Sequence, residues 1–219
     1  MFSRLQLLRA SATVGLPVAL APEGTIAATP DAADYAFDRE EFERRLALKY
    51  RHRQAFAASH LDGGSVLHYI RNSLTAYSAA DGFAEGPGTL HAAAVLYGAS
   101  IATVLDDAMW SNFHLAAFLT RFGERLQVSA DQRNNPYLDA SMRLRSAGVS
   151  FFVCRNALQS ICDNLAAAPE GKGASGREIF STLKRHFIAD ALLVPAGVAA
   201  LNALQEAHFT LVQASCGAL

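Results

Sequence analysis

Five short apolar runs alternate with helix-like segments along this chain, and the alternation limits the folds open to it. The runs cover residues 53–59, 89–98, 149–154, 191–197 and 209–214. The third, VSFFVC, is rich in β-branched and aromatic residues, the composition of a strand. Because no two-residue hairpin signal joins any pair of runs, the pattern predicts a parallel sheet covered by helices on both faces. We expect a three-layer α/β/α sandwich with a five-stranded, mostly parallel sheet, a variant of the flavodoxin-like arrangement.

The segments between the runs carry good helix formers or apolar residues at helical spacing. We expect helices over residues 37–53, 65–77, 102–126, 137–147, 155–165, 176–187 and 198–207. The stretch 102–126 is expected to be one long, mostly helical segment that holds the single tryptophan, Trp110. Residues 29–50 are interpreted as a linker with an N-terminal helix, and residues 51–219 as one α/β domain.

The first 28 residues have the composition of an export signal. Two arginines, Arg4 and Arg9, precede a mildly apolar stretch that ends in small residues near Ala21 and Ala28. The stretch is too short for a stable membrane span, which takes roughly 20 apolar residues. Leu5 stands where a twin-arginine signal would have its second arginine. We expect a periplasmic or secreted protein; the alternative is a cytoplasmic protein whose N-terminal helix frays.

Charge and cysteine content exclude several classes of function. The net charge is −1, with mixed signs along the chain, so no nucleic-acid partner is expected. There are three cysteines, an odd number too small for a disulfide framework. No C-x-x-C, H-x-x-x-H or H-E-x-x-H spacing occurs, so no metal site is predicted. The glycines of GFAEGPG lack the strand and helix of a dinucleotide-binding turn, and no cofactor is predicted.

Ligands of parallel α/β sheets bind outside the carboxyl ends of the strands, so the residues after each strand are the candidate site. They are His60, Gly63 and Gly64 after the first strand, Tyr97 and Gly98 after the second, Cys154, Arg155 and Asn156 after the third, and Pro195 and Gly197 after the fourth. His60 is the candidate base. Asp106 and Asp107 are interpreted as a solvated helix start, with a metal or substrate contact as the alternative.

Cys154 is the candidate catalytic residue. We expect its sulfur to emerge at the first turn of the next helix into a solvent-reachable hollow. The free backbone amides there, and Arg155 next to it, would favour the thiolate. The alternative is an inert, buried thiol that closes a strand. We interpret Cys162, eight residues later, as a core residue, and Cys216 as an exposed residue of the C-terminal tail that could link chains.

The segments AGVSFFVCRNAL and LLVPAGVAALNALQEAHFTLVQ resemble the closing half of DsrE/DsrF-like proteins, a family related to sulfur relay. HLDGGSVLHYIRNSL and AVLYGASIATVL resemble its opening half more loosely. The resemblance implies that Cys154 accepts and passes on a persulfide, that a sulfur donor or acceptor protein is a partner, and that the chain forms a homo-oligomer. Three features depart from the family: His208 replaces a glycine, residues 106–138 are longer, and an export signal is unusual.

Three functional hypotheses follow. The first is an exported sulfur carrier that uses Cys154, with Asn156 and the backbone of Gly197 shaping its pocket. The second is a non-catalytic module that binds a small ligand, or assembles with itself, through the same strand-end crevice. The third is a nucleotide-binding, flavodoxin-like protein with a phosphate or flavin at the turn 63–65. The apolar residues of 113–122 favour an oligomer, although core packing explains them equally well.

Overall fold

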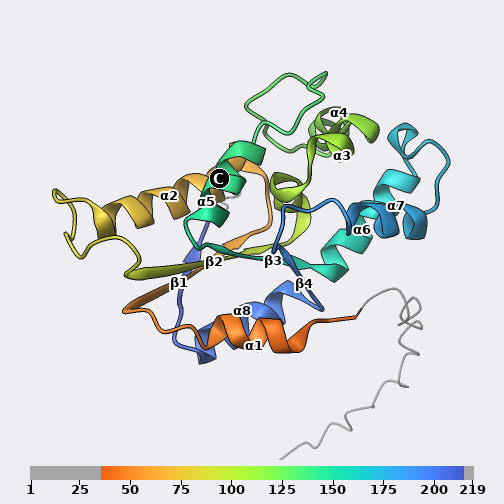
Figure 1. Ribbon diagram of the computed structural model, residues 1–219. Coiled ribbons are helices and arrows are strands. Elements are labelled where there is room, and N and C mark those ends of the chain that lie inside the picture. The colour runs from red at the N-terminus through yellow and green to blue at the C-terminus, as the bar shows by residue number, and fades with distance from the viewer. Residues whose placement is uncertain (1–35, 215–219) are drawn as a thin grey trace, which may run out of the picture. The chain divides into compact units, whose positions relative to one another are not determined.

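A computed structural model describes residues 36–214, and within this range the chain forms a single five-stranded parallel sheet (Figure 1). The strands are β1 (His52–Ala58), β2 (Leu90–Leu96), β3 (Ser150–Cys154), β4 (Leu192–Val194) and β5 (Thr210–Gln213). Their order across the sheet is β4-β3-β2-β1-β5, and every neighbouring pair is parallel. All five predicted strands are present, and the predicted parallel sheet is confirmed.

Helices cover both faces of the sheet, which confirms the three-layer α/β/α sandwich (Figure 1). One face carries α1 (Arg39–Leu46) and α8 (Gly197–Glu206). The other carries α2 (Ser65–Ser78), α3 (Asp107–Asn112), α4 (Leu115–Arg121), α5 (Leu138–Ser146), α6 (Arg155–Ala166) and α7 (Gly176–Leu183). Short 3₁₀ turns, η2 (Asp62–Gly64), η3 (Gly98–Val104) and η4 (Pro169–Gly171), join them.

Chain direction explains which helix lies on which face. The connections from β1 to β2, β2 to β3 and β3 to β4 step across the sheet in one direction. The connection from β4 to β5 returns across the sheet in the opposite direction. Because crossovers between parallel strands are right-handed, reversing the direction puts the crossover helix on the other face. This is why α8 joins α1, while the helices of the three forward crossovers share the opposite face.

Residues 102–126 are mostly helical, as predicted, but they do not form one continuous helix. The segment is divided into η3, α3 and α4. Asp106 accepts the backbone N–H of Met109 at 2.9 Å and so starts α3 as its N-cap. His114, with φ at +45°, interrupts the segment before α4, because a residue in the left-handed region cannot continue a right-handed helix. The helices predicted over 37–53 and 176–187 are also shorter, and they end at Leu46 and Leu183.

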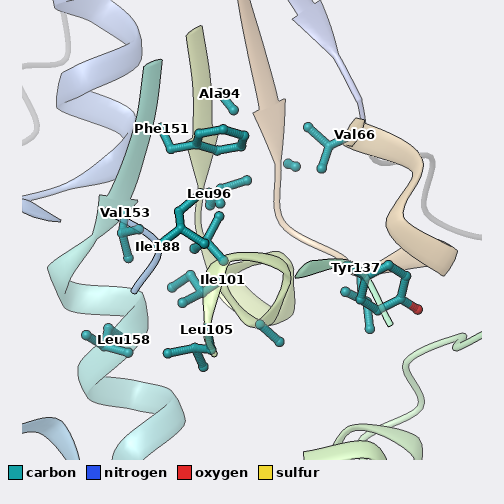
Figure 2. Close-up of a cluster of buried hydrophobic side chains, with 14 of the residues drawn as sticks. Val66, Ala94, Leu96, Ile101, Leu105, Tyr137, Phe151, Val153, Leu158 and Ile188 are labelled. Atoms are coloured by element: carbon teal, nitrogen blue, oxygen red, sulfur yellow. The ribbon is translucent and has the colours of Figure 1, made fainter. Parts of the chain in front are cut away.

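The larger apolar core fills the space between the sheet and the six-helix face (Figure 2). The sheet contributes Ala94, Leu96 and Phe151, and α6 contributes Leu158. Trp110 is fully buried, and its indole N–H donates to the carbonyl oxygen of Ala102 at 2.9 Å. The polar end of this large side chain is therefore satisfied inside the core.

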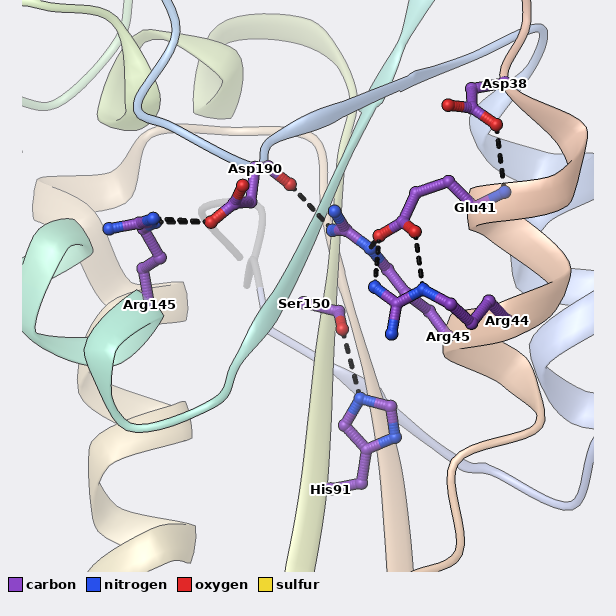
Figure 3. Close-up of polar contacts among 8 residues, drawn as sticks. All are labelled: Asp38, Glu41, Arg44, Arg45, His91, Arg145, Ser150 and Asp190. Atoms are coloured by element: carbon purple, nitrogen blue, oxygen red, sulfur yellow. Dashed lines mark hydrogen bonds and ion pairs between the residues drawn. The ribbon is translucent and has the colours of Figure 1, made fainter.

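The opposite face has a smaller apolar cluster. Polar groups that are buried on this face, among them Arg45 and His91, are drawn in Figure 3. Arg45 is 9% exposed; it donates to Glu41 Oε1 at 2.6 Å and to the carbonyl oxygen of Asp190 at 2.7 Å. Hydrogen bonds from Arg44 and Arg45 lower the pKa of Glu41 to about 2. His91 is 1% exposed, with Nε2 3.1 Å from Ser150 Oγ. Burial, and then the nearby arginines, lower the pKa of His91 to about 4.

Candidate functional site

Three of the predicted site residues meet where β2, β3 and β4 end. A side-chain carbon placed on Gly197 would lie 3.2 Å from Cβ of Cys154 and 3.4 Å from Cβ of Tyr97. Cys154 also pairs directly with Val194 across β3 and β4. The strand exits therefore bring Tyr97, Cys154 and Gly197 together, as their positions after separate strands predict.

Cys154 is both the last residue of β3 and the N-cap of α6. Its backbone is extended, at φ −71° and ψ 116°, and the next residue begins the helix. Sγ accepts the backbone N–H of Ala157 at 3.4 Å, the contact that a serine hydroxyl makes in an ordinary N-cap. The helix end thus directs one of its free amides at the sulfur atom.

The same junction is a topological switch point of the sheet. β3 continues into α6 on the six-helix face, whereas its neighbour β4 continues into α8 on the opposite face. Parallel sheets form their ligand crevices where neighbouring strands lead to opposite faces. Cys154 and Gly197 begin these two diverging helices, so both lie at the switch point.

The prediction of a solvent-reachable hollow around the sulfur is wrong in one respect, because Cys154 is buried and only 6% exposed. Gly197 has no side chain, which lets the start of α8 approach Cys154 and Tyr97 closely. Around this junction Asn156 and Pro195 are exposed, while Tyr97 and Arg155 are half-buried. Solvent reaches the surroundings of the thiol more readily than the thiol itself.

The predicted residues after β1 form a separate group. His60 is exposed, and its Nδ1 lies 2.9 Å from Glu124 Oε1, so the candidate base is already engaged. Gly63 and Gly64 donate their backbone N–H groups to the carbonyl oxygens of Arg125 and Leu61, at 2.8 and 2.7 Å. The side chains of Gln127 and Tyr137 cover the two glycines. The turn therefore has no free amide at these positions for the phosphate predicted at residues 63–65.

A cleft of about 350 Å³ opens beside the exit of β2, between α4 and α6. Its wall is mostly apolar. The lining includes Gly98 and Ala99 of η3, Phe118 and Leu119 of α4, Phe122 and Glu124 after it, and Ala157, Ser160, Ile161 and Asn164 of α6. Of these residues, only Gly98 was among the predicted site residues, whereas Phe118, Leu119 and Phe122 belong to the apolar stretch 113–122 that was interpreted as an oligomer surface or as core. The available signal in the sequence was the pair Phe118 and Phe122, four residues apart, but a core helix gives the same pattern. In the structure Phe122 is 53% exposed.

The acidic pair has the structural role that was favoured in sequence analysis. Asp106 caps α3, and its other oxygen lies 2.7 Å from Nδ1 of His186. Asp107 accepts the backbone N–H of Asn135 at 2.7 Å. Among residues 36–214 there is no cluster of three or more histidine, cysteine, aspartate or glutamate side chains suited to holding a metal ion.

The two remaining cysteines differ in what the structure shows. Cys162 is fully buried in the larger core, as predicted, and burial raises its pKa to about 12. Cys216 and the expected export signal, residues 1–28, lie outside the described residues. Within the described part of the chain, no helix is long and apolar enough to cross a membrane.

Comparison with known proteins gives one distant structural match. No family model matches the chain, and no curated protein matches its sequence. A solved structure of a protein of unknown function from Methanobacterium thermoautotrophicum is 16% identical in sequence. The alignment covers 74% of this chain and 98% of that one, with a TM-score of 0.41.

Proposed function

We propose that the protein carries sulfur on Cys154, accepting it from a persulfide donor and passing it to a thiol. The observation that carries the proposal is the position of Sγ at the switch point between β3 and β4, within hydrogen-bonding distance of the N–H of Ala157. The N-terminal ends of two helices, α6 and α8, lie beside the sulfur-bearing residue. The sequence resemblance to DsrE/DsrF-like proteins suggests the same residue.

The transfer uses only thiol–persulfide exchange. The Cys154 thiolate attacks the outer sulfur of a donor persulfide, a bond forms between Sγ and that sulfur, and the donor thiolate leaves. In the second step an acceptor thiolate attacks the same outer sulfur, and Cys154 recovers its electron pair as a thiolate. No external oxidant or reductant is needed.

Labelling of the thiol tests the proposal. In a Cys216→Ser background, iodoacetamide at neutral pH should modify Cys154 and leave Cys162 unmodified, as mass spectrometry of peptides would show. Because Cys154 is only 6% exposed, its labelling should be slower than that of a free cysteine peptide. Incubation with a low-molecular-weight persulfide should add one sulfur atom to Cys154. A Cys162→Ala variant is the matched control and should take up sulfur normally, whereas Cys154→Ser should take up none.

An inert Cys154 would overturn the sulfur-carrier proposal. If neither iodoacetamide nor the persulfide modifies it in the folded protein, the thiol is structural. The same fold would then serve as a non-catalytic module that binds a small ligand or assembles with itself.

Location and assembly are part of the proposal. An exported carrier would lose residues 1–28, so N-terminal sequencing of the protein from the extracytoplasmic fraction should begin near Thr29. Light scattering on that material should give the mass of a homo-oligomer if the chain assembles as the resemblance implies. A donor or acceptor protein should exchange radiolabelled sulfur with Cys154 but not with Cys154→Ser.

A further inference from the structure

We propose that the cleft between α4 and α6 binds a small molecule with an apolar body and an amino group that reaches Glu124. The volume of about 350 Å³ lies within the range of small-ligand pockets. Phe118, Leu119 and Phe122 form one side, and Ala157 and Ile161 form the other. These side chains provide an apolar surface for the body of the ligand.

Glu124 supplies the specificity. Its side chain is 11% exposed, and its two oxygens accept from the backbone N–H of Leu61 at 2.8 Å and contact Nδ1 of His60 at 2.9 Å. An ionised carboxylate offers about four acceptor positions, so these contacts leave acceptor capacity for a ligand. A carboxylate shielded from water makes strong hydrogen bonds to cationic donors.

The cations nearest in sequence to Glu124 are engaged elsewhere. Arg121 pairs with Glu170, and Arg125 pairs with Asp62. Within residues 36–214, Glu124 contacts the amide of Leu61 and the imidazole of His60, and its two neighbouring arginines pair with other carboxylates. An ammonium group on the ligand would complement this charge, whereas a carboxylate on the ligand would be repelled.

The cleft is next to the thiol but is a different site. Ala157 links the two: its N–H donates to Cys154 Sγ, and it lines the cleft. Cys154 itself does not line the cleft. Ligand binding should therefore survive Cys154→Ser, which separates this inference from the sulfur-carrier proposal.

A fluorescence titration of the full chain tests the inference, with 1-aminoanthracene as an apolar aromatic amine probe. The fluorescence should rise to saturation with one site per chain. Hexylamine should displace the probe at a concentration at least tenfold lower than hexanoate, because one charge-assisted hydrogen bond is worth about a factor of ten or more. Glu124→Gln keeps an acceptor for the N–H of Leu61 and should abolish this difference.

Two filling variants and one control complete the experiment. Ser160→Trp places an indole in the cleft from an exposed position and should weaken probe binding at least tenfold. Ala157→Phe should have the same effect from the same side of the cleft. Val198→Trp adds the same indole to α8, on the opposite face of the sheet, and should leave binding unchanged. The inference is overturned if the probe does not saturate, if Ser160→Trp binds it like the wild type, or if hexanoate competes as well as hexylamine.

Discussion

The two helical layers of this protein differ in what they bury against the same sheet. The six-helix face packs a large apolar core that includes Phe56, Phe151 and Trp110. The face with α1 and α8 packs a smaller cluster around Phe152, and it also encloses His91 and Arg45. Neighbouring residues of β3, Phe151 and Phe152, thus enter two different environments, because successive side chains of a strand point to opposite faces.

The difference follows from topology. Three forward crossovers deliver their helices to one face, whereas a single return crossover and the N-terminal helix cover the other. With fewer helices, the second face completes its cover with polar side chains that bond to each other and to the backbone (Figure 3). The candidate thiol lies where the two layers begin to diverge. Substitutions and changes of pH are therefore expected to affect the stability and the function of the protein differently on the two faces.

The largest expected effect comes from truncating the two phenylalanines of β3. Phe151→Ala should lower the free energy of unfolding by about 4–5 kcal/mol, because it leaves a cavity in a densely filled core. Phe152→Ala should cost about 3 kcal/mol, because its neighbours Phe42 and Arg45 lie on a single short helix that can move into the space. Urea unfolding of both variants measures the two costs. An equal or larger loss for Phe152→Ala would break the comparison between the faces.

Lowering the pH should reduce the free energy of unfolding, because His91 is buried on the face with α1 and α8. The pKa of His91 is about 4 in the folded protein and about 6.5 when unfolded. Between these values only the unfolded state binds the proton, so stability should fall as the pH drops from 6.5 to 4, by up to about 3 kcal/mol. The neighbours Tyr50, Phe209 and the arginines 45 and 53 exclude water and repel the added charge.

Unfolding at a series of pH values checks this effect. His91→Gln should flatten the curve between pH 6.5 and 4, whereas His68→Gln, at an exposed position, should keep the slope of the wild type. Glu41 acts in a lower window, because its pKa falls from 4.5 to about 2 on folding and its stabilisation is lost as the pH falls through that range. An unchanged slope in His91→Gln would assign the acid response to other groups.

A smaller effect on stability is expected at Gly197, where α8 begins beside Cys154. Gly197→Ala puts a methyl group 3.2 Å from Cβ of Cys154 and 3.4 Å from Cβ of Tyr97, so the start of α8 must move by a few tenths of an ångström. We expect a loss of about 1 kcal/mol. The shift should also loosen the cover of the thiol and raise its alkylation rate at least twofold. Thermal melting and iodoacetamide labelling measure the two results; a slower alkylation would show that the glycine opens the site rather than closing it.

The smallest effect is expected on the outer surface of α8. Val198 is 71% exposed, so Val198→Ser should change the free energy of unfolding by no more than about 0.5 kcal/mol. Urea unfolding measures it. A loss above 1 kcal/mol would show that this apolar side chain is covered in solution, and would point to an interface on this face.

Most of the fold was predictable because buried parallel strands have a distinct composition. The runs containing Ala94 and Phe151 were located from their apolar residues alone, and the absence of hairpin turns gave the strand direction. The break at His114 was not predictable, because a positive φ at a histidine leaves no mark in the sequence. The fourth strand was expected to have Pro195 at its exit, and the sheet pairing does end at Val194, since Pro195 has no N–H to donate.

The candidate site was predictable only as a set of strand ends. The rule for parallel sheets selected Cys154, Tyr97 and Gly197, and the structure brings these three together. Strand order was needed to find the switch point, and it depends on long-range packing that a single sequence does not reveal. The cleft was missed for a similar reason: residues such as Ala157 and Phe118 have no distinctive chemistry until two helices face each other.

The return of the chain from β4 to β5 also affects how the protein is made. β5 pairs with β1, and Ala214 donates its N–H to the carbonyl oxygen of Ala57, more than 150 positions earlier. Because the ribosome makes the chain from its N-terminus, this flank of β1 must stay unpaired until residues 210–214 have been synthesised. A nascent chain that stalls before position 210 would expose this strand to neighbouring chains, so translation speed between the codons of β1 and those of β5 should influence the yield of folded protein.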